Sequence, residues 1–295
     1  MRQIDFPSNP DDTLPIKHEE RSLGVILVKT GMLTPENVGR IVRFQREKNL
    51  RFGDAATQLG LLSQSDIQFA LSRQFVYPYL QRGESRVSDD LVAAYEPFSP
   101  QVEALRALRS QLMLRWFDSD PTRKALAIIG AARKEGRSYL TANLAVVFSQ
   151  LGEHTLLIDA NMRNPSHHKL FGLGNHAGLS EVLSGRGGLE VIQRIPGLLD
   201  LSVLPAGAQP PNPLELLSRP LFARLLNDLA QNFDVILLHS PPAAEYTDAQ
   251  MIAVRAGAAL IVARRNVTRM WQVRGVSNTV AQASAIVVGS VLNEF

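Results

Sequence analysis

Six short apolar runs beyond Lys124 constrain the fold more than any other feature of this sequence. Each is rich in Ala, Val, Ile and Leu, and segments of helical length and pattern separate them. The runs span residues 125–131, 154–160, 200–206, 234–240, 258–264 and 285–292. Apolar runs that alternate with helices indicate parallel strands buried on both faces. The sequence therefore predicts an α/β fold with a doubly wound, mostly parallel sheet.

The first apolar run leads into a loop and a helix that have the outline of a phosphate-binding site. At the N-terminus of such a helix, free amides and the helix dipole attract phosphate. Gly136 permits close backbone approach, Arg137 carries a charge toward the β- and γ-phosphates, and Ser138 can ligate Mg²⁺. We expect ATP to contact Ala131, Ala132, Arg133, Lys134, Glu135, Gly136, Arg137, Ser138 and Tyr139.

A repeat occupies the N-terminal part of the chain, where residues 21–45 align with residues 50–74. Thr34 and Ser63 each precede an apolar pattern of helical period and can cap the helix that follows. Each copy predicts a short helix, a glycine-containing turn and a longer helix. We therefore expect a small helical tandem-repeat domain over 21–80.

Composition and local sequence suggest how the rest of the chain is organised. Residues 1–20 lack the apolar core of a signal peptide and read as a disordered tail, and 81–100 read as a linker to a domain over 101–295. The absence of cysteine excludes disulfides and thiolate zinc sites, and a net charge of +3 does not call for a nucleic-acid partner. No long apolar run is present, so we expect a cytoplasmic protein.

Four motifs, in order, resemble those of bacterial tyrosine kinases (BY-kinases). They are the helix with Glu103, Arg106 and Arg109, the phosphate loop, LLIDANMRNP from Leu156 and DVILLHSPP from Asp234; VLPAGAQPPNPLELL from Val203 is also typical of the family. The resemblance implies a MinD/ParA-like P-loop domain, and it extends to the EpsG-type kinases of exopolysaccharide chain-length determination. It further implies a homo-oligomer built through the Glu103 helix, and recruitment to the inner membrane by a membrane chain-length-determinant (Wzz-like) protein.

The same resemblance implies catalytic roles for Asp159, Asn161, Arg163 and His239, and metal binding by Ser138 and Asp159. It also implies an adenine contact for Asn293. In the phosphate loop, Lys134 stands where such loops carry a glycine and Arg137 where they almost always carry a lysine. Two further positions depart from the family pattern, because Asn161 and His239 stand where the family has carboxylates. Neither suits Mg²⁺ as a carboxylate does, since that ion prefers oxygen ligands and charge. ATP binding is therefore expected, with weakened Mg²⁺ binding and catalysis.

Two further histidines, His167 and His168, follow the second acidic motif. An adjacent pair without a third ligand is a weak indication of a metal site. We therefore expect both to lie at the surface.

The N-terminal repeat resembles the tandem-motif N-terminal domain of type II secretion and pilus ATPases, which in some members binds cyclic di-GMP. On that resemblance, the residues expected at such a ligand are Gly24, Gly31, Gln45, Arg51, Gly53, Asp54, Gly60 and Gln74. Ser22 stands where the first copy would need the Arg that Arg51 provides in the second.

Three functions remain open from the sequence. The first is a BY-kinase-like ATP-binding protein of exopolysaccharide synthesis, and the second is a non-catalytic pseudokinase adaptor whose repeat senses cyclic di-GMP or binds a partner. The third is a positioning ATPase of the MinD/ParA kind. Such ATPases carry a signature Lys before the loop, where this chain has Ala132, so the third is disfavoured.

Overall fold

The computed structural model describes residues 22–74 and 79–294, which belong to two compact units, Met1–Tyr77 and Pro78–Phe295. The tail predicted over 1–20 lies outside the described residues. Within the described parts, no helix combines the length and the apolar character that crossing a membrane requires.

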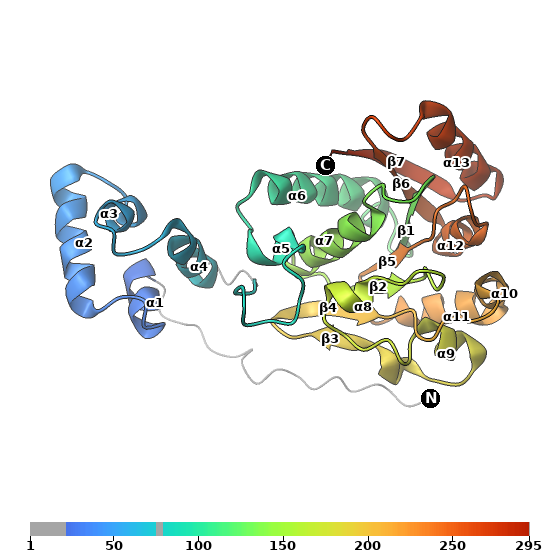
Figure 1. The fold of residues 1–295 in the computed structure, drawn as a ribbon, viewed down its shortest axis with the longest axis horizontal. Helices are drawn as coiled ribbons and strands as arrows, with labels where there is room; N and C mark the ends of the chain where they lie inside the picture. Colours follow the sequence, from blue (N-terminus) through green and yellow to red (C-terminus); the bar gives the residue numbers. More distant parts are fainter. Residues whose placement is uncertain (1–21, 75–78, 295) are drawn as a thin grey trace. The chain divides into compact units, whose positions relative to one another are not determined.

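Four helices make up the described part of the N-terminal unit (Figure 1). They are α1 (Leu23–Lys29), α2 (Pro35–Lys48), α3 (Phe52–Gln58) and α4 (Gln64–Gln74). Thr34 caps α2 by accepting from the Asn37 amide, and Ser63 and Asp66 cap the start of α4 reciprocally. Buried Leu, Ile and Ala side chains from all four helices form one small core.

A seven-stranded sheet forms the centre of the C-terminal unit, with strand order β3-β4-β2-β5-β1-β6-β7. The strands are β1 (Ala125–Gly130), β2 (Thr155–Asp159), β3 (Gln193–Ile195), β4 (Leu198–Leu204), β5 (Val235–His239), β6 (Ala258–Arg264) and β7 (Ile286–Asn293). Every pairing is parallel except that of β3 with β4. The predicted fold class is confirmed. The short edge strand β3 was not predicted, because three residues carry no readable alternation.

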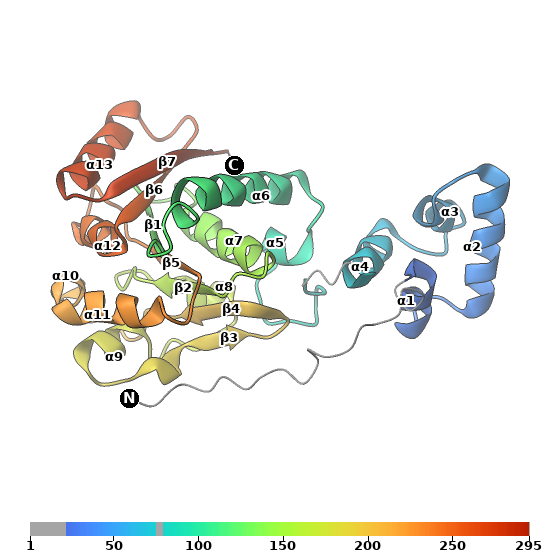
Figure 2. The same cartoon turned by 180° about the vertical axis from the view of Figure 1, so that it is seen from behind.

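Helices cover both faces of this sheet and enclose two separate cores (Figures 1 and 2). One face is covered by α5, α6 and α7, and the other by α9 to α13. The helices are α5 (Val92–Tyr95), α6 (Pro100–Leu112), which continues as a π-helical turn (Met113–Phe117), α7 (Arg137–Ser149), α8 (His167–Leu170), α9 (Leu179–Ser184), a 3₁₀ turn (Leu189–Val191), α10 (Pro213–Ser218), α11 (Pro220–Leu229), α12 (Asp248–Ala256) and α13 (Met270–Gln282). Helix α7 is buried along nearly its whole length, which fixes its N-terminus against the ends of β1 and β5.

The segment expected to be a linker, 81–100, packs on the C-terminal unit. Ala93 is fully buried, its amide donates to Asn143 Oδ1 at 2.9 Å, and its carbonyl accepts from Gln150 Nε2 at 2.9 Å. Both partners lie at or next to α7, so this segment belongs to the wall around the sheet. The prediction of a linker was wrong. Gly, Ser, Pro and charged residues dominate the composition of this segment, but its few apolar residues make the packing contacts with the C-terminal unit.

Candidate functional site

The loop between β1 and α7 keeps the backbone path expected of a phosphate cradle. Gly136 has φ 86° and leads directly into the first turn of α7. Lys134 has φ 60°, a left-handed conformation that glycine adopts readily and a lysine does not. The chain therefore preserves the turn even where the expected glycine is replaced.

Two charged side chains of the loop fold back into it. Arg137 Nη1 donates to the Gly130 carbonyl at 3.0 Å, and burial lowers the pKa of this guanidinium to about 10, so it stays charged at neutral pH. Glu135 is buried and accepts from the Ala132 amide at 3.0 Å and from Thr268 Oγ1 at 2.7 Å. In this conformation Arg137 stabilises the loop instead of extending toward a phosphate, and one cradle amide is engaged by Glu135. No sequence pattern predicts the contact with Thr268, which follows β6, the strand that pairs with β1.

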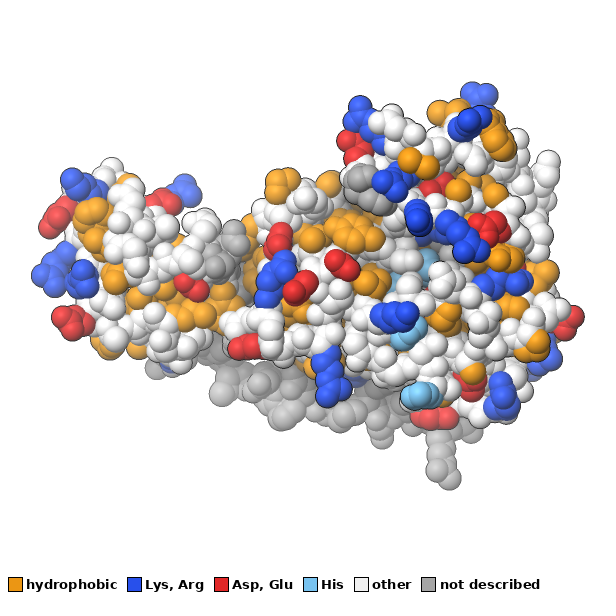
Figure 3. Space-filling model, viewed as in Figure 1, with side chains coloured by type: hydrophobic (Ala, Val, Ile, Leu, Met, Phe, Trp, Pro, Cys, Tyr) orange, Lys and Arg blue, Asp and Glu red, His pale blue; other side chains and the backbone are white. Residues whose placement is uncertain are grey.

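A groove of about 710 Å³ lies at the other end of the loop, between α6, the start of α7 and the end of β7. Tyr139 and Asn293 are among the residues that line it. Asn293 Nδ2 also donates to the Glu135 carbonyl at 3.2 Å, which ties the end of β7 to the loop. Figure 3 shows apolar surface on this face of the C-terminal unit next to Lys and Arg side chains. The site thus combines a phosphate loop with an apolar groove beside it.

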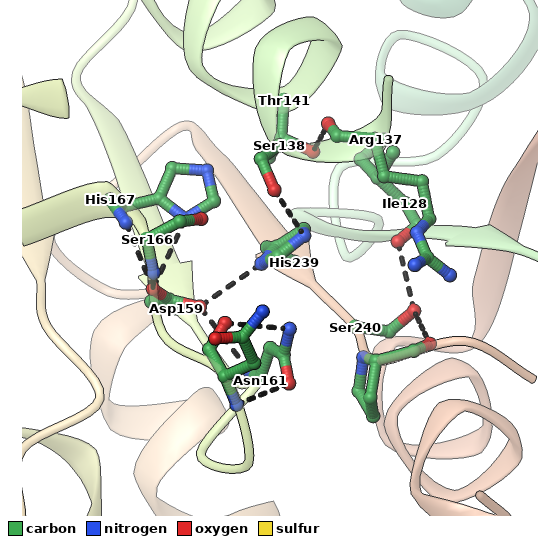
Figure 4. Close-up of polar contacts among 12 residues, drawn as sticks. Ile128, Arg137, Ser138, Thr141, Asp159, Asn161, Ser166, His167, His239 and Ser240 are labelled. Carbon is green, nitrogen blue, oxygen red and sulfur yellow. Dashed lines mark hydrogen bonds and ion pairs between the residues drawn. The ribbon is translucent and has the colours of Figure 1, made fainter. Parts of the chain in front are cut away.

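Three side chains from three elements meet below the loop (Figure 4). Asp159 ends β2 and His239 ends β5, and these two residues are direct partners in the parallel register. His239 Nδ1 lies 3.0 Å from Asp159 Oδ1, and its Nε2 lies 3.1 Å from Oγ of Ser138 in the first turn of α7. The result is a continuous hydrogen-bonded chain from the carboxylate through the imidazole to the loop serine.

Burial sets the protonation of this chain of groups. Burial, together with the neighbouring His167, lowers the pKa of His239 to about 4, so its ring is neutral at neutral pH. Burial alone would raise the pKa of Asp159, but the interaction with His167 and the hydrogen bond from His239 outweigh it and hold that pKa well below its usual range. Asp159 is therefore an anion that accepts a hydrogen bond from the neutral His239 imidazole.

The other two predicted catalytic residues point elsewhere. The Asn161 side chain closes its own turn, accepting from the Asn164 amide at 3.2 Å and donating to the Asn164 carbonyl at 3.0 Å. Arg163 makes a two-pronged ion pair with buried Asp248, at 3.0 and 3.1 Å, and stacks over the Tyr246 ring. Neither residue contacts the Asp159 carboxylate through its side chain in this conformation.

The groups around Asp159 do not fit Mg²⁺. This ion requires near-octahedral oxygen coordination, and several of its oxygens are normally waters. Beside the Asp159 carboxylate stand two imidazoles, with His239 Nδ1 3.0 Å from Oδ1 and His167 Nδ1 3.2 Å from Oδ2. The hydroxyl of Ser138, the second expected Mg²⁺ ligand, is hydrogen-bonded to an imidazole. Nitrogen thus stands where the ion would need oxygen.

The expectation that His167 lies at the surface is wrong. Its side chain is fully buried, its ring packs edge-on against His239 with 4.6 Å between centroids, and its Nδ1 lies 3.2 Å from Asp159 Oδ2. His168, its neighbour, is half-buried. Nothing in the spacing separates the two histidines. Only the fact that His167 lies in the connection that follows β2, and so close to Asp159 in the chain, could have pointed to its burial.

The helix expected at an oligomer interface is α6. Glu103 is exposed and pairs with Arg106 at 3.2 Å, whereas Arg109 Nη1 donates to the Val147 carbonyl of α7 at 2.7 Å. Arg109 therefore anchors α6 to its own domain. Glu103 remains accessible to a partner, and the oligomer itself stays a prediction.

The glycines of the N-terminal repeat serve its packing. A side chain at Gly24 would meet Val38 at 3.2 Å, and one at Gly53 would meet Ile67 at 3.1 Å. Gly31 and Gly60 have φ 73° and 65° just after α1 and α3. Arg51 and Asp54 are exposed, and Gln45 and Gln74 are half-buried. These roles account for the glycines without a ligand, and cyclic di-GMP binding stays a prediction.

Comparison with known proteins places the C-terminal unit among kinases. The chain is 33% identical over 199 residues to a putative tyrosine-protein kinase, CapB, of Staphylococcus aureus, covering 68% of this chain and 86% of that one. It is 34% identical over 193 residues to the tyrosine-protein kinase ptk of Acinetobacter johnsonii, covering 65% of this chain and 26% of that protein. The chain thus spans about a quarter of the length of this longer relative. No model of a protein family matches.

Solved structures of known proteins also resemble this chain. The kinase domain of the Escherichia coli tyrosine kinase ETK superposes with a TM-score of 0.68 at 32% identity, over 73% of this chain and 83% of that one. The cell division ATPase MinD of Pyrococcus furiosus superposes with a TM-score of 0.51 at 22% identity, over 58% of this chain and 72% of that one. The second likeness is one of fold alone.

Proposed function

The chain belongs to the bacterial tyrosine-kinase (BY-kinase) family, and from this premise we propose that it is an ATP-binding regulator of exopolysaccharide polymerisation or chain length whose phosphoryl transfer is weakened. The phosphate loop supports nucleotide binding, with its positive-φ turn at Gly136 and its exit into α7. The groove lined by Tyr139 and Asn293 supports a place for the base.

One observation carries the weakened chemistry: His239 joins Ser138 to Asp159 by hydrogen bonds where the family has a carboxylate. A charge-assisted contact is worth about 1.5–3 kcal/mol. With His239 and Asn161 both replacing carboxylates, stabilisation of a metal–nucleotide complex falls on the order of a hundredfold to ten-thousandfold, if the two losses add. Phosphoryl transfer depends mainly on such positioning and electrostatics. The protein would then act as a pseudokinase, through nucleotide-dependent assembly.

The proposed partners follow from the family. A membrane chain-length-determinant (Wzz-like) protein would recruit this chain to the inner membrane, and copies of the chain would associate through α6. The exposed carboxylate of Glu103 is the group on α6 that we assign to this contact.

Calorimetric titration with ATP, with and without Mg²⁺, tests the proposal. We expect micromolar binding that Mg²⁺ strengthens by less than about tenfold, a difference of under about 1.4 kcal/mol. A hundredfold strengthening by Mg²⁺, together with phosphotyrosine formation in the presence of the membrane partner, would show a working kinase and contradict the proposal.

We also propose a second candidate function, sensing of cyclic di-GMP by the N-terminal repeat. Arg51 favours it: the side chain is exposed and has no hydrogen-bond or ion-pair partner among residues 22–74 and 79–294. An arginine fork of this kind suits a phosphate or a guanine edge. Titration with cyclic di-GMP should show binding that Arg51→Ala abolishes and Arg46→Ala, an exposed arginine on α2, leaves intact. Equal binding by the two variants would exclude Arg51 as a contact.

A further inference from the structure

The cluster of Asp159, His167 and His239 brings three metal-ligating side chains together in the interior. They come from the end of β2, the start of α8 and the end of β5, and all three are buried. One ligand atom from each lies within 4.8 Å of the others. Figure 4 shows both imidazole rings beside the Asp159 carboxylate. In the sequence, the His167–His168 pair has no third metal ligand. In the fold, Asp159 and His239 lie beside His167 and supply two more.

The separations are close to those of a coordinated metal. Zinc bonds to His nitrogen and carboxylate oxygen at about 2.0–2.2 Å, which puts tetrahedral ligand atoms about 3.3 Å apart. In this cluster His239 Nδ1 lies 3.0 Å from Asp159 Oδ1 and His167 Nδ1 lies 3.2 Å from the second oxygen, Oδ2. The cluster is thus nearly preformed.

The surrounding hydrogen bonds are those that orient metal ligands. A metal-bound histidine usually donates its second ring N–H to a neighbouring acceptor, and a ligating carboxylate is itself hydrogen-bonded. With Nδ1 of His239 on a metal, its Nε2 faces Ser138 Oγ at 3.1 Å. The amides of Ser166 and His167 already donate to Asp159 Oδ2. No new contact is needed to support a bound ion.

The His167 ring supplies an independent sign of a ligand at this cluster. Neither ring nitrogen makes a hydrogen bond in the described part of the chain, and Nδ1 has only its 3.2 Å ion-pair contact with Asp159 Oδ2, although the side chain is fully buried. Leaving a buried polar group unsatisfied is costly. Coordination would use one of these nitrogens, and a divalent cation would balance the buried Asp159 carboxylate.

We infer that Asp159, His167 and His239 form a site for a transition-metal ion of the Zn²⁺ class. Two imidazoles and one carboxylate suit Zn²⁺, Co²⁺ or Ni²⁺, whereas Mg²⁺ selects all-oxygen sets. Three protein ligands leave a fourth position for water or another small donor. The inference stands on the cluster itself and does not depend on the proposed regulatory function.

Cobalt provides the first test, without nucleotide. The untagged full chain is freed of metal with a chelator, titrated with Co²⁺ and followed by its visible absorption bands. We expect saturation at one Co²⁺ per chain and displacement by Zn²⁺. His167→Leu, which replaces one buried side chain with an apolar one, should lower the affinity at least as much as loss of an outer-shell partner does, about 10–100-fold. The matched control, His168→Gln, should bind as the wild type does. Absence of the bands, or equal loss in both variants, would overturn the inference.

Thermal unfolding of the wild type gives a readout that needs no variant. Zn²⁺ at about a hundred times its Kd should raise Tm by about 5–10 °C, and Mg²⁺ at the same concentration should not. His239→Asn, a second ligand variant, should lose the Zn²⁺-dependent shift even if His167→Leu folds poorly. A Tm that responds to Zn²⁺ equally in wild type and His239→Asn would place the ion elsewhere and contradict the inference.

Discussion

The phosphate loop and the strand ends below it depart from the family pattern in different ways. In the loop, Lys134 replaces an expected glycine and Arg137 an expected lysine, yet the backbone keeps its left-handed turn and its exit into α7. At the strand ends, β2 and β5 keep their register, yet His239 changes what Asp159 faces. On the proposed function, phosphate binding that rests on backbone amides is kept when side chains change, whereas metal binding that rests on carboxylate oxygens is weakened.

The largest expected effect lies at the strand ends. Asp159→Ala removes a buried carboxylate and leaves the amides of Ser166 and His167 and the His239 ring without their acceptor. Breaking a buried pair in this way costs about 3–5 kcal/mol. Urea unfolding should show this loss, whereas Asp228→Ala, at an exposed position on α11, should unfold like the wild type. If the two variants were equally stable, the Asp159 cluster would not hold the strand ends together.

A second substitution tests whether His239 is the residue that weakens Mg²⁺ binding at the strand ends. His239→Asp frees the Ser138 hydroxyl and restores an oxygen ligand. One restored charge-assisted contact of about 1.5–3 kcal/mol corresponds to roughly a tenfold to hundredfold gain in Mg²⁺-dependent ATP affinity. Calorimetry with and without Mg²⁺ measures it, and His239→Asn, of similar size but without charge, is the control. A gain in both variants would mean that relief of the hydrogen bond, not the carboxylate, matters.

Residues that follow apolar strands were predictable from the sequence, and residues that fold back from elsewhere were not. The strands near Asp159 and His239 follow from their apolar runs, and parallel topology alone brings their ends together. The burial of His167 depends on how the connection after β2 turns back toward Asp159, and this path cannot be predicted from hydrophobic periodicity. The same holds for the 81–100 segment, where Ala93 and Leu91 are buried among residues of loop-like composition.

The direction of the side chains within the phosphate loop could not be predicted from the sequence either. The residue types at Glu135 and Arg137 predicted charge near a phosphate. The structure shows both side chains bonded within the loop or to Thr268. Charge at a position can be read from sequence, but the partner that captures it is set by the packing of α7 and β6 around the loop.

The smallest expected effect lies in the phosphate loop, where two substitutions at residue 134 separate the cost of the backbone conformation from the loss of the lysine charge. Lys134 holds φ 60°, which costs a non-glycine residue about 1–2 kcal/mol, while glycine costs about 0.4–1 kcal/mol through the unfolded chain. Lys134→Gly should therefore stabilise the protein by about 1 kcal/mol or less relative to Lys134→Ala, which also loses the charge but keeps the strain. For a unit of this size, that is a rise in Tm of at most about 2–4 °C, measured by thermal unfolding. Equal Tm values for the two variants would mean that the loop relaxes around residue 134, and that its backbone path is not what the chain has preserved.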